Sequence, residues 1–360
     1  MLVVNPGSTS TKIAFFVGEE CIFSQHINHP RQELLGFGRI IEQLPYRLNY
    51  IKNALKKAGI SPANCAAVVG RGGLLHPMAG GTYQVNEAML ADLEAGIQGE
   101  HPANLGGIIA HKIGVEYGIP AFIVDPVSVD EMDAVCRISG LKEITRSSLG
   151  HYLNVRRIAR LAAEDMGKDY GLCNFVLAHL GGGISIFAMY KGRLVDVDSA
   201  NHEGPFSPNR TGGLSSTDLI ELCYSGKYTK NELLTKILHQ GGVYSYLGTA
   251  DIKEVEAKIV QGDKEALIVL EAMALQIAKN IAAMATVLKG VVDAVILTGG
   301  VAYSQLVTNY IRERVEFIAP VLLYPGEEEM AALAEGALRV VKGEEAAKVY
   351  MGKGGLNNEA

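Results

Sequence analysis

Cysteine is scarce in this 360-residue sequence, and its pattern argues against two common uses of the residue. The number is odd and the residues stand singly. They show neither the paired spacing of a disulfide framework nor the CxxC spacing of a zinc site. A reducing cytoplasm is therefore the expected location. The five residues are Cys21, Cys65, Cys136, Cys173 and Cys223.

Basic residues are not in excess, and no targeting or membrane-spanning segment is evident. The formal net charge of −6 and the sequence pI of about 5.9 argue against a nucleic-acid-binding surface. An apolar strand predicted from residue 2 leaves no room for a signal peptide. We therefore expect neither nucleic acid nor a membrane as a partner. The length is sufficient for two domains with their own cores.

Two common nucleotide-binding motifs are also missing. No GxGxxG follows a strand in a βαβ context, and GxxxxGK[ST] does not occur, since residues 7–12 only imitate it. The chain opens with hairpin strands instead of βαβ units. A Rossmann dehydrogenase and a P-loop NTPase are therefore poor interpretations.

What the sequence does have is a repeated hairpin. Residues 3–18 and 177–192 each show an apolar strand, a turn of small residues, a second apolar strand and a Gly-containing turn into a third strand. The repetition predicts a duplicated domain with two phosphate-holding turns that face one cleft. It favours an enzyme that handles a nucleotide. In the alignment Gly7 matches Gly181, Ala14 matches Ala188 and Gly18 matches Gly192.

Helices and further strands follow each hairpin. Apolar runs at 66–69, 121–124 and 294–297 indicate buried parallel strands. Small apolar residues on most faces of 266–288 predict a buried central helix. The fold class is therefore α/β, with three hairpin strands in each half followed by alternating helices and strands.

Six motifs occur in the order found in one enzyme family. They give the sequence a resemblance to the acetate/butyrate kinase family of the actin–hexokinase–Hsp70 superfamily, from residue 2 to about residue 341. Six ordered motifs are far more specific than any single Gly-rich turn. The motifs are residues 5–12, 70–73, 179–183, 204–210, 297–300 and 327–330.

The resemblance implies a fold, a reaction and an assembly. The fold is a pair of ribonuclease-H-like (actin-like ATPase) domains, each a mixed five-stranded sheet flanked by helices, with a cleft between them. The reaction is ATP-dependent phosphorylation of a short-chain carboxylic acid to an acyl phosphate with Mg²⁺, usually run toward ATP, in a homodimer or larger homo-oligomer. The implied domains are 1–148 with a helix at 327–345 (acyl-substrate side), 149–326 (nucleotide side) and a flexible tail at 346–360.

Two arginines suit the chemistry of such a transfer. A carboxylate has a pKa near ~4, so it is already ionised at neutral pH and needs no general base. The repulsion between this anion and the phosphoryl group must be offset instead, which a planar guanidinium does well. Arg71, at the end of a predicted buried strand, and Arg210 resemble the catalytic arginines. A surface salt bridge for Arg71 and a solvated loop position for Arg210 are the structural alternatives.

Two histidines are further candidates. The resemblance implies that His151 donates a hydrogen bond to the transferred phosphoryl group and that His179 faces phosphate. Both residues have a structural alternative, since a lone histidine is more often a satisfied structural residue.

Small polar residues and glycines supply the predicted nucleotide site. Groups on the first hairpin can face phosphate or metal, although the same residue types are common in ordinary turns. Backbone N–H groups of the second turn can cradle phosphates, and a later glycine pair resembles the adenosine-binding turn. Asp251 resembles a ribose or adenine contact and could equally be a helix N-cap. The other candidates are Asn5, Ser8, Ser10, Lys12, Gly181, Gly182, Gly183, Gly299 and Gly300.

Three residues are candidates for holding Mg²⁺: Asn5, Asp125 and Glu328. Asp125 ends a predicted strand and Glu328 begins a predicted helix, and both offer oxygen ligands through water. Glu327 and Glu329 flank Glu328, so the run does not say which glutamate serves the metal. A glutamate at a helix start also complements the helix dipole. In alcohol kinases of the superfamily the Asp125-like position is a general base, whereas here it is expected to orient an arginine or the metal.

Three glycines depart from the family pattern. Gly72 and Gly73 stand beside Arg71 where acetate kinases carry bulky residues, and Gly150 precedes His151 where the family usually has phenylalanine. We expect these changes to enlarge the acyl pocket, which favours butyrate or a branched acid over acetate. The alternatives are a superfamily kinase acting on an alcohol or sugar, and an Hsp70- or actin-like ATP-driven binding protein.

Overall fold

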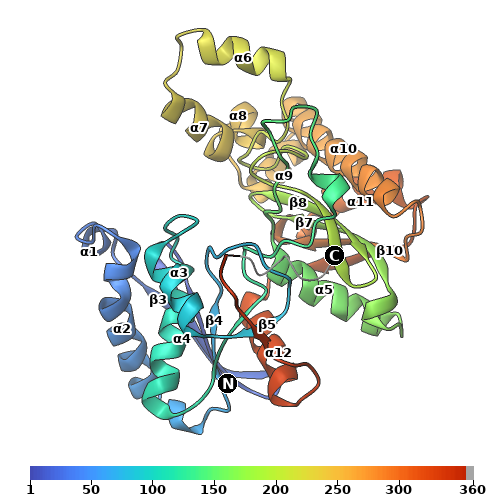
Figure 1. Ribbon diagram of the computed structural model, residues 1–360. Coiled ribbons are helices and arrows are strands. Elements are labelled where there is room, and N and C mark those ends of the chain that lie inside the picture. Colours follow the sequence, from blue (N-terminus) through green and yellow to red (C-terminus); the bar gives the residue numbers. More distant parts are fainter. Residues whose placement is uncertain (354–360) are drawn as a thin grey trace. The chain divides into compact units, whose positions relative to one another are not determined.

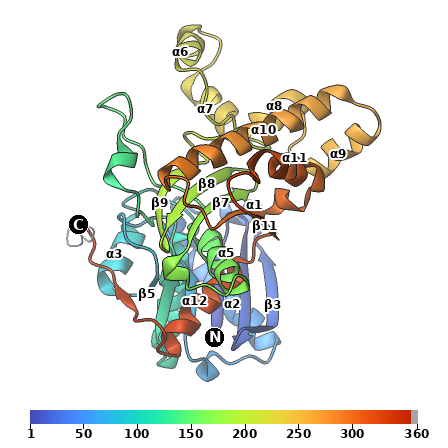
Figure 2. The ribbon, with the colours of Figure 1, turned by 90° about the vertical axis from the view of Figure 1, so that its right-hand side faces the viewer.

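The computed structural model describes residues 1–353, which divide into two compact units (Figures 1 and 2). The first unit comprises Met1–Asp130, Tyr152–Asn154 and the described chain from Glu328 onward. The second comprises Glu131–His151 and Val155–Glu327. This division differs from the expected boundary at 148, because residues 131–148 cluster with the second unit.

Seven strands form the sheet of the first unit. The β1–β2 and β2–β3 pairs are antiparallel, whereas β4 runs parallel to β1 and β6 runs parallel to β4. β5 is antiparallel to β6, and β12 is parallel to β5. In spatial order the strands are β12 (Lys348–Val349), β5 (Thr82–Gln84), β6 (Ala121–Val124), β4 (Val68–Arg71), β1 (Leu2–Pro6), β2 (Ser10–Val17) and β3 (Glu20–Asn28).

Helices cover both faces of this sheet because its central strands are apolar on both sides. In β1, Leu2 and Val4 pack on the side of α2, α3 and α4, and Val3 packs against α12 on the other side. Figure 1 shows these two layers. The helices are α1 (Arg31–Leu34), α2 (Leu44–Lys57), α3 (Glu87–Ala95), α4 (Asn104–Tyr117) and α12 (Glu329–Val341), with 3₁₀ turns at Ile40–Gln43 and Pro62–Asn64.

Two expectations for the first unit need correction. Its sheet has seven strands instead of five, because β5 and β12 extend one edge. The segment from residue 346, expected to be a flexible tail, pairs through β12 with β5, and the buried Tyr350 hydroxyl donates to Asp92 Oδ2 at 2.7 Å. A buried aromatic ring with a bonded hydroxyl anchors this segment. The last part of the predicted tail, 354–360, lies outside the described residues.

Five strands, as predicted, form the sheet of the second unit. β7, β8 and β9 make an antiparallel meander, and β10 runs parallel to β7, as β4 does to β1. The predicted duplication is therefore present in the topology. In spatial order the strands are β11 (Val321–Pro325), β10 (Ala294–Gly299), β7 (Asn174–Leu180), β8 (Ile184–Tyr190) and β9 (Arg193–Asp198).

The long helix α10 (Lys264–Val287) is the central helix of the second unit. Its N-cap, Asp263, accepts a hydrogen bond from the Ala266 N–H at 3.0 Å. Met273, Ile277 and Ile281 are buried in the same core as strands β7 and β8. Within residues 1–353, α10 is the one helix long and apolar enough to cross a membrane, but a core helix meets the same criterion, so this is weak evidence.

The remaining helices of the second unit do not all pack on its sheet, since Ser216–Tyr224 and Lys230–His239 extend away from it (Figures 1 and 2). α11 shares the core of α10, and α5 lies on the opposite face (Figures 1 and 2). They are α5 (Tyr152–Asp165), α6 (Ser216–Tyr224), α7 (Lys230–His239), α8 (Gly242–Leu247), α9 (Ile252–Val260) and α11 (Gln305–Val315), with 3₁₀ turns at Ala134–Arg137, Tyr170–Leu172 and Gly300–Tyr303.

Candidate active site

Arg71 is the last residue of β4, and two glycines fix its position. A side chain on Gly70 would overlap the carbonyl group of Gly106 in α4, and a side chain on Gly106 would overlap the carbonyl group of Arg71. α4 therefore packs directly on the backbone of β4, an approach that only glycine allows. This packing holds the strand end that carries the Arg71 side chain.

Glu329 joins two of the predicted site residues. Its Oε1 accepts a hydrogen bond from Arg71 Nη1, and its Oε2 accepts one from Asn5 Nδ2 at 2.8 Å. Glu329 is the first residue of α12, where the helix dipole favours a negative charge. The Arg71 and Glu329 side chains keep 25% and 22% of their surface exposed. The pair is therefore accessible to a small ligand.

The three consecutive glutamates divide between the two units. Glu327 belongs to the second unit, and its Oε1 lies 2.8 Å from His179 Nε2. Glu328 is exposed and is the N-cap residue of α12, and Glu329 makes the contacts just described. The sequence analysis preferred Glu328. Which of the three glutamates makes these contacts depends on the residue at which α12 begins, and no motif in the run reveals that residue.

The carboxyl ends of three parallel strands bring Asn5, Arg71 and Asp125 to one edge of the first sheet. In the ladder Arg71 pairs with Val124, and Asp125 follows directly. Asp125 is buried with a left-handed φ of 37°, and its Oδ1 accepts from the Gly81 N–H at 2.7 Å. Ligands of α/β sheets bind outside the carboxyl ends of parallel strands. This edge is therefore the candidate site of the first unit.

The turn between β1 and β2 carries the other first-hairpin candidates. The Gly7 N–H donates to the Ser10 carbonyl at 2.8 Å and closes the turn. Ser8 and Lys12 are exposed, and Ser10 is half-buried. Lys12 lies directly opposite Asn5 in the antiparallel ladder, so both side chains share one face of the sheet.

A buried arginine of α2, Arg47, holds this turn from the protein interior. It donates hydrogen bonds to the carbonyls of Ser8 and Ser10 and to the Thr11 hydroxyl. Sequence reasoning missed Arg47, because a single arginine within an amphipathic helix belongs to no motif and is normally expected at the surface.

In the second unit, Arg210 lies against the glycine turn between β7 and β8. A side chain on Gly183 would overlap the Arg210 guanidinium in its present position, so glycine permits this close approach. Gly181 donates its N–H to the Gly183 carbonyl at 3.2 Å and closes the turn. Ser207 Oγ donates to the Gly182 carbonyl at 2.5 Å, which fastens the loop before Arg210 to the turn.

The Arg210 guanidinium has an unused donor. Its Nη1 donates to Asn201 Oδ1 at 2.6 Å, whereas its buried Nε has no hydrogen-bond partner among the described residues. Asn209 Oδ1 is likewise buried without a partner there. Burial lowers the pKa of Arg210. Because an unsatisfied buried donor is costly, an anionic oxygen bound at this turn would find a ready partner.

His151 and His179 stack on each other in the second unit, with ring centroids 3.9 Å apart and planes inclined by 14°. His179 is fully buried in β7, with the Glu327 carboxylate close to its Nε2. His151 is the N-cap residue of α5, and its Nδ1 lies 3.2 Å from Ser185 Oγ in β8. The two predicted histidines therefore form one group.

The predicted adenosine turn and Asp251 lie on different elements of the second unit. Gly299 has a φ of 90°, and a side chain there would overlap the Leu180 carbonyl, while Gly300 is exposed with open space beside it. Because β10 runs parallel to β7, this pair lies at the same sheet edge as the Gly181–Gly183 turn. Asp251 is exposed and caps the N-terminus of α9, where it accepts a hydrogen bond from the Lys253 N–H at 2.9 Å. It therefore makes the N-cap bond that the sequence analysis gave as the alternative to a nucleotide contact.

The acetokinase family model matches residues 150–349. Butyrate kinase 1 and butyrate kinase 2 of Clostridium acetobutylicum are each 50% identical to the chain, over 97% of its length and 99% of theirs. The chain belongs to the acetokinase family. The crystal structure of Porphyromonas gingivalis acetate kinase has the same fold, with 20% identity, a TM-score of 0.78 and coverage of 94% of this chain and 99% of that one.

The three glycines expected to depart from the family pattern do not leave free space in the direction of a side chain. A side chain on Gly72 would overlap the Pro126 ring, and one on Gly73 would overlap Asn104. A side chain on Gly150 would overlap the ring of Phe187, which is fully buried in β8. The expectation that these positions enlarge an acyl pocket is therefore wrong, because neighbouring groups already fill the directions in which their side chains would point.

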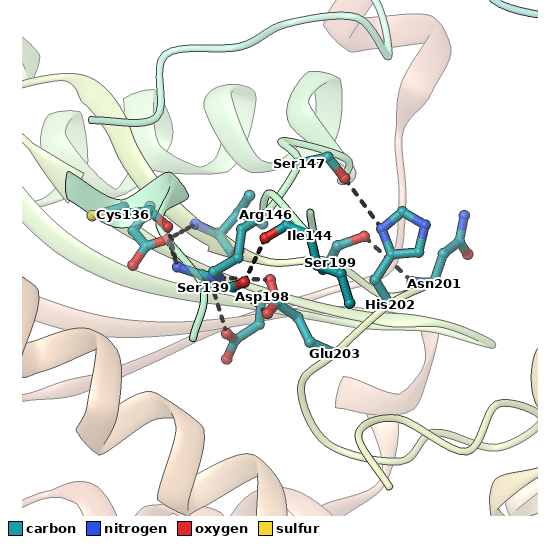
Figure 3. Close-up of polar contacts among 12 residues, drawn as sticks. Cys136, Ser139, Ile144, Arg146, Ser147, Asp198, Ser199, Asn201, His202 and Glu203 are labelled. Atoms are coloured by element: carbon teal, nitrogen blue, oxygen red, sulfur yellow. Dashed lines mark hydrogen bonds and ion pairs between the residues drawn. The ribbon is translucent and has the colours of Figure 1, made fainter. Parts of the chain in front are cut away.

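A cluster around Arg146 in the second unit was not foreseen from the sequence (Figure 3). Arg146 pairs with Asp196 Oδ1 and Glu203 Oε2, both at 3.0 Å, and its Nη2 lies 3.6 Å from Asp198 Oδ1. Burial raises the pKa of Asp198 to about 7; the charge of Glu203 adds to this shift and that of Arg146 opposes it. The three acidic residues are far from Arg146 in sequence, so only folding reveals the group.

The Arg146 cluster supports the loop that holds Arg210. Asp198 and Glu203 flank Asn201, whose side chain accepts the Arg210 hydrogen bond. Figure 3 shows Asn201 on this loop together with His202, whose Nδ1 lies 3.2 Å from Ser147 Oγ. The acidic residues are therefore explained by anchoring of the loop.

Proposed function

We propose that this acetokinase transfers a phosphoryl group directly from ATP to a short-chain carboxylic acid, butyrate or a branched acid, and also runs toward ATP. The Clostridium acetobutylicum relatives are butyrate kinases, and identity at half of the positions over nearly the whole chain supports the same reaction. The observation that carries the proposal is Arg71, a partly exposed guanidinium at the carboxyl ends of parallel strands. A planar guanidinium can bind a carboxylate through two parallel hydrogen bonds.

In the first unit, Arg71 binds the substrate carboxylate and offsets its charge. Glu329 orients the guanidinium through Nη1 and leaves its other donors for the substrate. Asn5 is held by the second oxygen of the same carboxylate. Since the acid is already ionised, no residue has to remove a proton. Ser8, Ser10 and Lys12 of the first hairpin contact the phosphoryl group.

In the second unit, the Gly181–Gly183 turn and Arg210 bind phosphate oxygens. The buried Nε of Arg210 and the backbone of a side-chain-free turn are suited to an anion. His151 donates a hydrogen bond to the transferred phosphoryl group, and His179, stacked on it, holds its ring in place. Gly299 and Gly300 lie against the adenosine.

Mg²⁺ fits the oxygen donors of the first unit only as a partner of the nucleotide. Among residues 1–353 no group of three or more His, Cys, Asp and Glu side chains could hold a metal ion by itself. Mg²⁺ typically uses one or two carboxylates together with substrate phosphates and water. Asn5, Asp125 and Glu328 or Glu329 would supply the protein's share. When bound, the ion neutralises charge on the phosphates.

We further propose a cytoplasmic homodimer or larger homo-oligomer. The five cysteines are all free, which suits a reducing compartment. Light scattering on the purified protein would give the mass, and a monomer would contradict the proposed assembly.

A hydroxamate-trapping assay with ATP and a series of acids tests the function. Linear C2 to C6 acids, branched acids and aryl acids are compared, and butyrate or a branched acid is expected to give the highest kcat/KM. Sugars and other alcohols serve as controls. Phosphorylation of an alcohol, or ATP hydrolysis that no carboxylate stimulates, would contradict the proposal.

A further inference from the structure

Arg47 is fully buried beneath the turn that joins β1 and β2. Its Nη1 donates to the Ser10 carbonyl at 2.9 Å and to Thr11 Oγ1 at 3.0 Å, and its Nη2 donates to the Ser8 carbonyl at 3.3 Å. Gln43 Oε1, one helical turn earlier, accepts from Nε at 3.0 Å and from Nη2 at 2.9 Å. All these bonds end on neutral oxygens.

The charge of Arg47 is not compensated. No carboxylate of residues 1–353 forms an ion pair with it. Burial lowers the pKa of Arg47 to about 10, so the group stays charged at neutral pH. The neighbouring His29, 2.8 Å from Thr11 Oγ1, has its pKa lowered to about 4 by burial and by Arg47, and is neutral. Glu33 is exposed and bonded to Tyr46.

Such a charge is expensive for the fold, which indicates a use for it. A structural role alone would be served as well by a neutral donor or by an arginine paired with an acid, because either would tie the turn to α2 without leaving a buried charge unbalanced. The bonds to Ser8 and Ser10 place this charge directly behind the turn.

The hydrogen bonds to Arg47 also set the direction of the turn's peptide groups. The peptide bonds are trans, so a carbonyl that points at Arg47 sends the N–H of the next residue the opposite way. The Ser8 carbonyl therefore directs the Thr9 N–H away from the guanidinium, at the exposed tip of the turn. The guanidinium polarises this peptide group and makes its N–H a stronger donor.

We propose that Arg47 is a positioning residue that shapes the Ser8–Thr11 turn and supplies it with positive potential for a phosphoryl group, on ATP or on the acyl phosphate. The inference rests on the proposed function, because it takes the ligand of the turn to be the transferred phosphoryl. Arg47 itself touches no substrate. It acts through the Ser8–Thr9 peptide group and through the fixed charge behind it.

Gln43→Glu is the decisive variant. Glutamate has nearly the shape of glutamine and can keep both bonds to Arg47, but it cancels the buried charge. We expect the melting temperature to stay equal or rise, while the affinity for butyryl phosphate, measured by calorimetry without ADP, falls about tenfold. KM for butyryl phosphate should rise in parallel. Asn53→Asp, which adds the same charge at an exposed position of α2, is the matched control and should change neither value.

Arg47→Lys is the complementary variant, because it keeps the charge and loses the fork. It should lower the melting temperature and keep the butyryl phosphate affinity within about threefold of wild type, since the potential persists. Wild-type affinity and KM in Gln43→Glu would overturn the proposal. Should Gln43→Glu not fold, Arg47→Lys decides: retained affinity supports the role of the charge, and lost affinity assigns the effect of Arg47 to the shape of the turn alone and overturns that role.

The wild-type enzyme separates this inference from the proposed function. Wild-type protein that forms no acyl phosphate from any acid refutes the proposed function itself. Active wild type together with unchanged Gln43→Glu refutes only the role of Arg47.

Discussion

Arg71 and Glu329 form an ion pair across a separation of 258 residues in the chain. The pair joins the end of β4 to the first residue of α12, and Asn5 binds the second oxygen of the same carboxylate. A guanidinium has five donors, so one bond to Glu329 orients Arg71 and leaves a face for a substrate carboxylate. Under the proposed function, the pair therefore prepares Arg71 for the anionic substrate.

Arg71→Ala and Arg210→Ala should each lower kcat for acyl phosphate formation by about 10³-fold, because charge-clamp residues in phosphoryl transfer contribute this much. The melting temperature should change little, since both side chains are partly exposed. Arg39→Ala, at an exposed ion pair with Glu100, is the control and should keep full activity. Retention of more than about a tenth of kcat, a loss under ~1.4 kcal/mol, would contradict the assignment.

Glu329→Gln should reduce kcat/KM for the carboxylic acid by at least about tenfold, because an amide cannot accept hydrogen bonds from both Arg71 and Asn5. The neighbouring Glu328→Gln is the matched control, since Glu328 is exposed. Steady-state kinetics at several Mg²⁺ concentrations tell the roles apart. A larger loss in Glu328→Gln that added Mg²⁺ restores would return the metal role to Glu328.

The sequence predicted the duplicated hairpins, the parallel strands and the central helix, because periodicity and Gly-rich turns report backbone structure. It also named Arg71 and Arg210, which both stand in Gly-containing motifs. It did not single out Arg47, whose contacts depend on burial, or the pairing of Glu329 with Arg71, which depends on where α12 begins. The expectation for Gly72, Gly73 and Gly150 failed because it also depends on packing. A missing side chain leaves free space only when no neighbouring group fills that space.

Gly150→Ala should destabilise the second unit by about 1–3 kcal/mol, because the added methyl group overlaps the buried Phe187 ring. Gly140→Ala is the matched control, since nothing lies within 4 Å of its added carbon. Thermal unfolding of both variants measures the difference. Equal melting temperatures would show that Phe187 moves aside without cost and that this direction is open after all.

Asp198→Asn should change how stability depends on pH. The folded-state pKa of about 7 exceeds the unfolded value of 3.8, so the folded state binds more protons between them and the free energy of unfolding falls as pH rises through this window. Asparagine does not titrate, so the variant lacks this decrease in the free energy of unfolding. The variant should therefore match wild type near pH ~5 and melt at a higher temperature near pH ~8. A parallel pH trend in both proteins would contradict the raised pKa.

Asp125→Asn tests whether the reaction needs a base. Asparagine tolerates a left-handed φ and can still accept the Gly81 hydrogen bond, and it removes the charge. Because the acid substrate carries no proton to remove, the wild-type rate should show no acidic limb from a catalytic carboxylate between about pH 5 and 8. The loss of activity in Asp125→Asn should be reduced by added Mg²⁺, since the missing charge serves the metal or an arginine. If Mg²⁺ leaves the variant inactive and a more basic pH restores it, Asp125 is a general base and an alcohol becomes the better substrate.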